Sequence, residues 1–549
     1  MQNISFKQLA RLPVQEIPRD IIVGSGHAGL SLALELCRKG RSVLVLESGM
    51  ERKSARHQDL AAAETIDLDR HDDMRIATCR EFGGTSNYWG ARCQPMDPID
   101  FTPERSFADI NWPIPRTELC QYASRAAALL QCGAPEFSKP IDGLNLSDTR
   151  FKTDRLERFS NVPKLQKAHA DEIATTPFLS IVFDCTVTGA QFDGDRLTHL
   201  ELKSLAGAEH VLPVERVTLA CGGVESTRTL LIFQKKSPMI AGGIAGALGR
   251  YYMGHIIGEV ADLHLASPEL DEAFDFHIDT YGSYVRHRLV PNDAQQIANA
   301  LPNISFWPVV PPIADSSHRD AILSMVFLAF RIGPIGRLLV AEAIRKRHIP
   351  EGTAIFPHIR NVILGIPRAV LFLPFFFKRR YFDKIRLPGF FLRNKGRVYG
   401  LSYHSEQSPS QSNGFTLAKK QDALGRPKLN IDLQFSRKDA EAVMRAHLDL
   451  DTWLRANELG YLRFHHPKDE TPDAILKLAA HGTHQIGTAR MASSPDTGCV
   501  DENLKVFGTT NLYLCSSATF PSSGQCNPTF TLVSLACRLA DHLADQNTQ

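Results

Sequence analysis

Two polar residues near the carboxyl end of this 549-residue chain have side chains suited to proton transfer. His484 lies in HGTHQIGTARM, and Asn527 precedes Pro528 in GQCNPTFTLVSLACRLADHL. An imidazole can act as a general base near neutral pH, and a carboxamide can hold a substrate oxygen without competing for its proton. Because proline is favoured in the first helical turn, Asn527 is expected at a helix start. These residues predict proton-transfer chemistry.

A dinucleotide-binding fingerprint lies near the amino end. Gly24, Gly26 and Gly29 follow an apolar strand-like run at 20–23 and open a helix-like segment. The first glycine permits a tight turn, the second lets the backbone approach a pyrophosphate, and the third lets helix and strand pack closely. Glu47 ends the next strand-like run, where a carboxylate can bind a ribose and would repel a 2′-phosphate. The fingerprint disfavours NADP, leaves FAD and NAD open, and predicts that the two ends of the chain fold together.

A second glycine-containing loop offers further contacts to a nucleotide. Gly83 and Gly84 are followed by Thr85, Ser86 and Asn87. These residues give a flexible turn with several small hydrogen-bonding groups, which suits phosphate or flavin contact. The same residues would be unremarkable in an ordinary turn, so this interpretation depends on the first fingerprint.

The order of strand-like and helix-like segments predicts an α/β protein with a Rossmann-like nucleotide-binding domain and a discontinuous α+β substrate domain. Strand patterns recur at 181–192, 216–223, 415–436 and 511–517, and helix patterns at 436–459 and 531–543. The predicted nucleotide-binding domain comprises 18–105, 176–260 and 481–549. The predicted substrate domain comprises 106–175 and 261–480, with a basic and apolar insertion around 319–397.

Composition argues against several classes of protein. A net charge of +2 gives no reason to expect a nucleic-acid partner. Eleven cysteines without a C-x-x-C pair argue against a disulfide framework and against a zinc site, so no metal is expected. The first twenty residues lack the apolar core of a signal peptide. A cytoplasmic protein is the resulting expectation.

The insertion differs from the rest of the chain in charge. From 319 to 397, sixteen Lys or Arg residues stand against four Asp or Glu residues. The apolar run at 369–382, which Lys378, Arg379 and Arg380 interrupt, is shorter than the roughly 20 residues that span a bilayer. Two interpretations stay open. The run is either a core or lid element with a basic flank, or a segment that rests on an anionic membrane surface, which would place the protein peripherally at the inner membrane.

Seven segments occur in the order of a known family. They are DIIVGSGHAGLSLALEL, GGTSNYWGARCQPMDPIDF, LACGGVESTRTLL, GRYYMGH, EQSP followed by DALGRPKLNIDL, HQIGTARM, and GQCNPTFTLVSLACRLADHL. Together they resemble the glucose-methanol-choline (GMC) oxidoreductases, which are FAD enzymes. The resemblance is closest to the bacterial branch near the pyranose oxidases and sugar dehydrogenases. It covers the FAD-binding parts well and residues 260–400 poorly.

The resemblance implies roles for individual residues. His484 matches the family's catalytic histidine, which takes a hydroxyl proton while hydride leaves for flavin N5, and Asn527 matches its partner. His255 matches a position near the cofactor and is expected to support the site, whereas His481 lies outside the motif and is a poorer candidate base. The residues expected to contact FAD are Gly24, Gly26, Gly29, Glu47, Gly84, Thr85, Ser86, Asn87, Val187, Ser516, Ser517, Pro528 and Thr529.

One departure from the family concerns the attachment of the flavin. In pyranose oxidases the loop after Gly-Gly carries a histidine that is covalently joined to flavin, and the matching residue here is Tyr88. The resemblance, with this departure, implies FAD that is bound without a covalent link.

The predicted function is FAD-dependent oxidation of an alcohol to a carbonyl, on a sugar, glycoside or polyol, with a dehydrogenase preferred to an oxidase. Oxygen, a quinone or a carrier protein is expected to accept the electrons. One alternative is the same chemistry on a hydrophobic or membrane-associated alcohol such as a sterol, terpenoid or lipid-linked glycan. The others are a non-catalytic flavin-binding protein and a plain NAD dehydrogenase.

Overall fold

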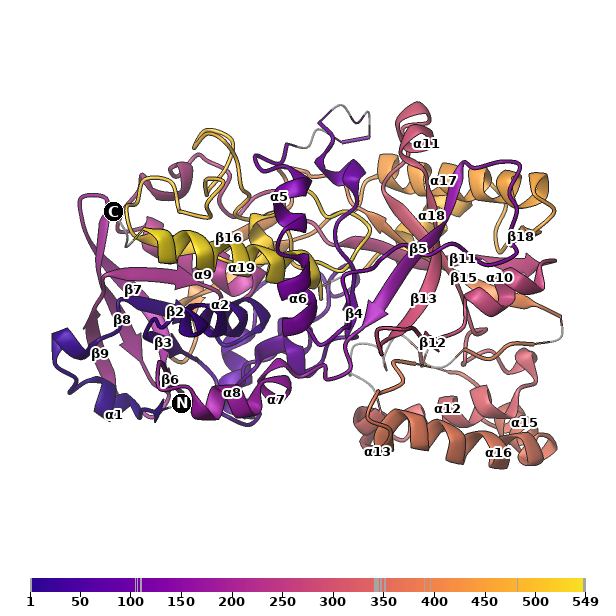
Figure 1. Cartoon of the computed structure of the whole chain (residues 1–549), viewed down its shortest axis with the longest axis horizontal. Helices are drawn as coiled ribbons and strands as arrows, with labels where there is room; N and C mark the ends of the chain where they lie inside the picture. Colours follow the sequence, from indigo (N-terminus) through magenta and orange to yellow (C-terminus); the bar gives the residue numbers. More distant parts are fainter. Residues whose placement is uncertain are drawn as a thin grey trace.

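Two large β-sheets, one parallel and one antiparallel, organise the molecule (Figure 1). The computed structural model describes residues 2–546 except 104, 106, 109–110, 340–344, 346–347, 350–351, 390, 395 and 481. The parallel sheet lies at the end of the molecule where both chain termini are found, and the antiparallel sheet lies toward the other end. The predicted α/β fold class is confirmed, with a Rossmann-like parallel sheet beside separate antiparallel sheets.

The parallel sheet takes its strands from distant parts of the chain. In spatial order they are β1 (Gln2–Asn3), β6 (Leu179–Val182), β3 (Val43–Leu46), β2 (Asp20–Val23), β10 (Arg216–Leu219) and β19 (Leu512–Leu514). All residues of β2, β3 and β10 are buried, as expected for parallel strands that are covered on both faces. Helices α2 (His27–Arg38) and α19 (Thr529–Asp545) pack against each other. The two ends of the chain therefore meet at this sheet.

The strand predicted over 181–192 is wrong as a single element. It divides into β6 and β7 (Thr186–Asp193), because Asp184 between them adopts a left-handed φ of 49°. The Asp184 carboxylate accepts a hydrogen bond from the backbone N–H of Leu205 at 2.8 Å, which holds the turn. Strands β7, β8 (Arg196–Lys203) and β9 (Glu209–Pro213) then form a small antiparallel sheet.

The antiparallel sheet carries the other half of the molecule. Its order is β18 (Gly460–Phe464), β11 (His255–Leu265), β15 (Val398–Glu406), β14 (Ile304–Val309), β13 (Tyr284–Pro291), β5 (Phe151–Phe159) and β4 (Arg92–Cys93), and β12 (His277–Ile278) pairs with β13. Helix α17 (Arg437–Ala456) packs beside β18, and its first turn is capped by the Ser436 hydroxyl, which accepts from Asp439 N–H at 3.0 Å. The strands β11 and β4 begin inside ranges that the sequence assigned to the nucleotide-binding domain.

The remaining elements connect and cover the sheets. The hairpin β16 (Gly414–Gln421) and β17 (Pro427–Asp432) replaces the single alternating stretch at 415–436. The other helices are α1 (Phe6–Leu9), α3 (Ala55–Gln58), α4 (Met74–Ala77), α5 (Arg116–Cys120), α6 (Ala123–Leu129), α7 (Leu165–Ala168), α8 (Ala170–Thr175), α9 (Gly223–Gln234), α10 (Pro268–Ala273), α11 (Asp293–Ala298) and α18 (Thr471–Leu478). The 3₁₀ turns are η1 (Val14–Glu16), η2 (Asp59–Ala61), η3 (Gly84–Asn87), η4 (Pro98–Phe101), η5 (Ile240–Gly242), η6 (Ser316–His318) and η8 (Ser517–Thr519).

A fully buried histidine on α17 makes the fold sensitive to acid. His447 donates Nδ1–H to the carbonyl of Val443 at 2.8 Å and lies between the rings of Phe306 and Tyr403. Burial lowers its pKa from 6.5 to about 4. Because the folded-state pKa lies below the ordinary value, the neutral ring's contribution to stability is present above pH 6.5 and is lost as the pH falls from 6.5 toward 4.

His447→Leu is therefore expected to reduce the acid sensitivity of folding. Between about pH 7.5 and about pH 5 the loss of unfolding free energy should be smaller than in the wild type by roughly 2 kcal/mol. Urea unfolding at both pH values measures this difference, and His466→Leu, at an exposed histidine, is the control. Equal losses in the wild type and in His447→Leu would contradict the assignment.

The basic and apolar insertion folds into what we call the helical lobe. It consists of α12 (Ala321–Arg331), α13 (Gly333–Leu339), α15 (Phe356–Leu364), α16 (Ile366–Phe377) and the π-turn η7 (Lys378–Phe382), which lie together below β12 in Figure 1. Helix α16 is not a core element, since Ala369 is its buried residue. Within the described ranges no helix has both the length and the apolar character to cross a bilayer alone, whereas Phe356–Leu364 and Ile366–Phe382 meet those criteria as a pair bent by 86°.

Candidate functional site

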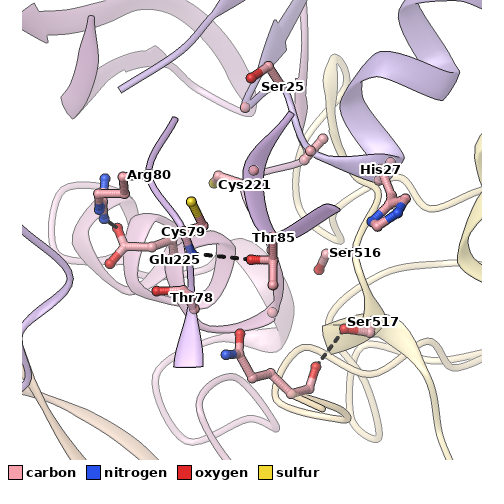
Figure 2. A pocket seen from close by; sticks show the side chains of 18 of the residues that line it. Ser25, His27, Thr78, Cys79, Arg80, Thr85, Cys221, Glu225, Ser516 and Ser517 are labelled. Carbon is pink, nitrogen blue, oxygen red and sulfur yellow. Dashed lines mark hydrogen bonds and ion pairs between the residues drawn. The ribbon is translucent and has the colours of Figure 1, made fainter. Parts of the chain in front are cut away.

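A cavity of about 340 Å³ lies at the carboxyl ends of β2, β3, β10 and β19. In an open α/β sheet this edge is where ligands bind, and the volume falls within the usual range for small-molecule sites. Figure 2 shows the small polar side chains of Ser25, Thr85, Ser516 and Ser517 around it. The cavity therefore brings together the amino-terminal fingerprint and the carboxyl-terminal segment.

The three fingerprint glycines differ in their surroundings. Gly24 has a φ of 102°, which favours glycine, and a Cβ there would lie 2.8 Å from the Ala220 carbonyl oxygen. A Cβ on Gly29 would lie 1.9 Å from the carbonyl oxygen of Gly24, so Gly29 permits close packing of helix and strand and does not line the cavity. A Cβ on Gly26 would meet nothing within 4 Å and would project from the cavity wall. Gly26 is thus the position where a ligand can approach the backbone.

Glu47 lines the cavity and also holds the glycine loop in place. Its carboxylate accepts from Ser25 N–H at 3.0 Å, from Ser25 Oγ–H at 2.5 Å and from Gly49 N–H at 2.7 Å. A carboxylate has about four acceptor sites, so capacity for a ribose hydroxyl remains. The structure thus adds a scaffolding role to the expected ribose contact.

The second glycine loop divides into cavity-lining and supporting residues. Gly84 and Thr85 line the cavity, and the Thr85 hydroxyl oxygen accepts from Cys79 N–H at 3.3 Å. Ser86 and Asn87 do not line it. Ser86 Oγ donates to the Gly83 carbonyl at 2.6 Å, and Asn87 Nδ2 donates to the Gly84 carbonyl at 2.9 Å. The side chains of Ser86 and Asn87 therefore stabilise the loop.

Sequence reasoning missed a buried ionic cluster at one side of the cavity. Arg80 and Arg426 contact the Glu225 carboxylate at 2.6 and 2.9 Å, and Arg228 contacts it at 3.2 Å. Burial alone would raise the pKa of Glu225, but the three guanidinium groups outweigh it and hold that pKa well below its ordinary value. Figure 2 shows the Arg80–Glu225 pair beside Thr78 and Cys79. Three distant segments form this cluster, so no local spacing signals it.

The residues after β19 join the catalytic segment to the sheet. Ser516 and Ser517 line the cavity, and Ser517 Oγ donates to the carbonyl of Gln485, the residue after His484, at 2.6 Å. Pro528 directly precedes α19, whose first residue, Thr529, lines the cavity with it. Val187, on β7, also lines the cavity.

Outside the guanidinium groups of Arg80 and Arg426, two buried polar atoms on the cavity wall have no hydrogen-bond partner among the described residues. They are Nε2 of His27 and Oδ1 of Asn527. A buried polar group without a partner is costly, so such atoms indicate a site where a ligand completes the hydrogen bonding. With the open space over Gly26, they fit a dinucleotide whose phosphates approach the start of α2 and whose reactive end approaches the start of α19.

Three histidine rings meet where His484 lines the cavity. Nδ1 of His484 lies 2.8 Å from Nδ1 of His255, the first residue of β11. His404, on β15, stacks on His255 with ring centroids 4.1 Å apart and an interplanar angle of 23°. His404 was not anticipated from the sequence, because the pairing of β15 with β11 brings it here. His481, the weaker candidate base, lies outside the described residues.

The hydrogen bonds assign a tautomer to His484. Nε2 of His255 lies 3.2 Å from the Ser523 carbonyl, which only accepts, so this nitrogen carries the proton. Burial lowers the pKa of His255 to about 3, so the ring is neutral and its Nδ1 is an acceptor. His484 therefore donates from Nδ1, and its lone pair is on Nε2. His484 also lines the cavity.

The same rings could be taken for a metal site, since their nitrogen atoms lie within 4.8 Å of one another. Their arrangement favours proton transfer instead. His255 and His404 lie nearly face to face, whereas ligands of one metal ion direct their in-plane lone pairs at a common point. His404 Nδ1 also donates to the Gln525 carbonyl, and burial holds the pKa of His404 well below its ordinary value.

Comparison with known families decides the nature of the carboxyl-terminal part. A family model described as GMC oxidoreductase matches residues 409–536, which include His484 and Asn527. This segment is thus similar to the GMC oxidoreductases. A second model, described as an NAD(P)-binding Rossmann-like domain, matches residues 22–51 around the glycine loop. The resemblance to the GMC oxidoreductases is thus confirmed for the carboxyl-terminal segment, and with the fold it supports the predicted FAD cofactor.

Two individual relatives match only part of the chain. The chain is 30% identical over 128 residues to a C-glycoside 3-oxidase of Microbacterium trichothecenolyticum. The matched residues make up 23% of each protein. It is 36% identical over 74 residues to dehydrogenase str4 of Strobilurus tenacellus. These residues make up 13% of this chain and 12% of that protein. The matches span less than a quarter of the length of either relative.

Solved structures share the fold over nearly the whole chain. An FAD-dependent oxidoreductase from Chaetomium thermophilum has a TM-score of 0.52 and 14% identity, covering 97% of this chain and 100% of that one. Pyridoxine 4-oxidase from Mesorbium loti has a TM-score of 0.51 and 16% identity, covering 96% and 99%. At such identities the likeness concerns the fold, which extends well beyond the GMC segment.

Proposed function

We propose that the chain is an FAD-dependent enzyme that oxidises a CH–OH group to a carbonyl. One observation carries this proposal. The His484 imidazole, whose lone pair is assigned to Nε2, and the Asn527 carboxamide line the same cavity as the glycine loop. Proton acceptor, oxygen-binding group and dinucleotide cradle are the parts that alcohol oxidation by a flavin requires.

Each side chain has one task in this reaction. When bound, FAD supplies the acceptor for the hydride that leaves the carbinol carbon. Nε2 of His484 takes the hydroxyl proton, while Nδ1–H stays bonded to His255 and fixes the orientation of the ring. Asn527 holds the alcohol oxygen by a hydrogen bond that its carboxamide N–H donates. His255 and His404 are not competing bases, because burial lowers their pKa values and makes both rings weak proton acceptors.

We further infer that FAD is held without a covalent link at the second glycine loop. Tyr88 lines the cavity where the pyranose oxidases carry the linking histidine, and the Lys53 ammonium lies 4.9 Å above its ring. The contacts would come from the glycine loop, Glu47 and the walls described above.

A sugar, glycoside or polyol is the first substrate class in this proposal. The sequence resemblance to sugar-oxidising members of the family supports it, as does the partial match to a protein named C-glycoside 3-oxidase. A hydrophobic or membrane-associated alcohol is the second candidate, and the exposed apolar side chains of the helical lobe favour it. We place the enzyme in the cytoplasm, as a dehydrogenase in preference to an oxidase, with oxygen, a quinone or a carrier protein as acceptor.

An anaerobic screen tests the proposal. Alcohols of both classes are added to the yellow holoprotein, and loss of the oxidised flavin spectrum identifies a substrate. Oxygen is then admitted, and rapid return of the spectrum would indicate an oxidase. A flavin that dithionite bleaches but that no alcohol bleaches would favour the alternative of a non-catalytic flavin-binding protein.

His255 is expected to act by positioning His484. His255→Leu removes the Nδ1 acceptor, so the His484 ring can adopt the tautomer in which Nε2 carries the proton and cannot act as a base. Loss of one buried hydrogen bond predicts a fall of about 10-fold in the rate of flavin reduction, with FAD still bound. Stopped-flow absorbance measures this rate.

The conservative variant His255→Asn separates positioning from structure. Its carboxamide oxygen can stand where Nδ1 stands and accept from His484, so the rate should recover toward that of the wild type. Equal rates in the Leu and Asn variants would contradict the positioning role.

A further inference from the structure

Exposed large hydrophobic residues are far more densely placed on the helical lobe than on the rest of the described chain. Half of the large hydrophobic residues that are exposed lie between Ile332 and Phe382. Phe356 and Leu371 each expose 78% of their area, and Phe382 exposes 81%. A contiguous apolar surface of this kind marks an interaction site. Its partner must match the chemistry of the lobe.

Helix α15 buries polar side chains and exposes apolar ones, the reverse of a helix that packs on a core. Its buried residues, His358 and Asn361, are both polar, and each lies 3.1 Å from the hydroxyl of Ser324 on α12. Phe356 and Ile363 face outward. An ordinary surface helix turns its apolar stripe to the core and its polar face to water. The polar anchoring of α15 leaves its apolar stripe directed away from the protein.

Helix α16 continues this surface through the π-turn η7. Ala369 is its buried residue, so nearly the whole helix stands outside the core. The exposed hydrophobic residues of α16 and η7 include pairs four or five positions apart, which lie on neighbouring faces: Ile366, Val370, Leu371, Phe375, Phe377, Tyr381 and Phe382. The two helices are bent by 86°, an L-shaped arrangement that can lie along a flat surface.

Cationic side chains border the apolar stripes. Lys378, Arg379 and Lys384 are exposed at the end of α16, and the Arg379 guanidinium lies 4.3 Å above the ring of Phe375. Long cationic side chains can cover apolar surface with their stems while the charged ends reach a polar layer. The described acids of the 319–397 stretch are Asp320 and Asp383, so the charge is strongly one-sided.

We propose that the helical lobe docks on the surface of a membrane that contains anionic lipids. The apolar stripes of α15 and α16 insert among the upper acyl chains, and the bordering cations lie at the level of the lipid phosphates. Charge complementarity favours an anionic membrane as the partner, because residues 319–397 contain sixteen basic and four acidic residues. This excess of positive charge matches a layer of anionic lipid headgroups. The inference does not depend on the alcohol chemistry of the cavity.

Vesicle co-sedimentation of the holoprotein tests the proposal. Vesicles of phosphatidylcholine alone are compared with vesicles that also contain phosphatidylglycerol, at low and at high salt. The protein is expected to pellet with the anionic vesicles, less with the neutral ones, and less at high salt. The triple variant Leu371→Ser, Phe375→Ser, Phe382→Ser should partition at least about 100-fold more weakly, because three large apolar side chains no longer leave water.

A matched control uses exposed apolar residues outside the lobe. Met239→Ser and Ile244→Ser together remove side chains that are 78% and 72% exposed, and this variant should bind vesicles like the wild type. Far-ultraviolet circular dichroism should be the same for both variants, since all five positions are exposed. Wild-type protein that stays in the supernatant with every vesicle would overturn the proposal. So would a dimer in gel filtration that the triple variant converts to a monomer without any vesicle binding, because a second copy of the chain would then cover the lobe.

Discussion

His484→Ala is expected to bind FAD normally and to lose most of its reduction by the alcohol. A positioned general base contributes about 10²- to 10⁴-fold to rate, so flavin reduction should slow by that factor. His255 and His404 should not replace the lost base, since burial lowers the pKa of His255 to about 3 and holds that of His404 well below its ordinary value. Anaerobic stopped-flow absorbance measures the rate, and the flavin spectrum of the purified variant measures occupancy.

The control for this prediction is His466→Ala, at an exposed histidine outside the cavity. It should reduce its flavin at the wild-type rate. Near wild-type reduction in His484→Ala would show that another group takes the hydroxyl proton, and the role assigned to His484 would be wrong.

Gly29→Ala is expected to have the largest effect on folding. The added Cβ would lie 1.9 Å from the Gly24 carbonyl oxygen, and both groups belong to backbone that is fixed by the sheet and by α2. Overpacking of this kind costs about 1–3 kcal/mol or more, and relief of the clash must displace the glycine loop. We expect a lower unfolding temperature of the apoprotein and little retained FAD, measured by thermal unfolding and by the flavin content after purification.

Gly26→Ala is the matched variant, with one methyl group added three residues away. Gly26 has a φ of −75°, which alanine adopts freely, and its Cβ would meet no atom within 4 Å. The apoprotein should therefore unfold at nearly the wild-type temperature. FAD affinity should fall at least about 10-fold, because the methyl group occupies the place where a pyrophosphate approaches the backbone. Wild-type FAD affinity in Gly26→Ala would contradict the location of the cofactor.

The elements that local sequence patterns specify were predictable. The glycine loop with its two flanking strands, the helix that starts after Ser436 and the carboxyl-terminal helix all have a periodicity or a cap within a few residues. These elements place Gly24, Glu47 and Asn527 at one cavity. The turn at Asp184 escaped prediction, because a left-handed aspartate within an apolar run has no distinct signature.

The parts that depend on tertiary pairing were not predictable. His404 reaches His255 through the register of β15 against β11, and no spacing in the sequence encodes that register. The ionic cluster around Glu225 likewise joins segments that are far apart in the chain. Which residues of the helical lobe are buried was likewise not predictable. Apolar periodicity predicts a helix, but it does not reveal that His358 and Asn361 face inward on α15.

The most direct test of the account is anaerobic reduction of the bound flavin by an alcohol, with the product counted. The account predicts that a substrate from the screen bleaches the flavin completely and that one carbonyl forms for each flavin reduced. It would be contradicted if no sugar, polyol or hydrophobic alcohol bleached a flavin that dithionite reduces, or if the flavin were bleached without formation of a carbonyl.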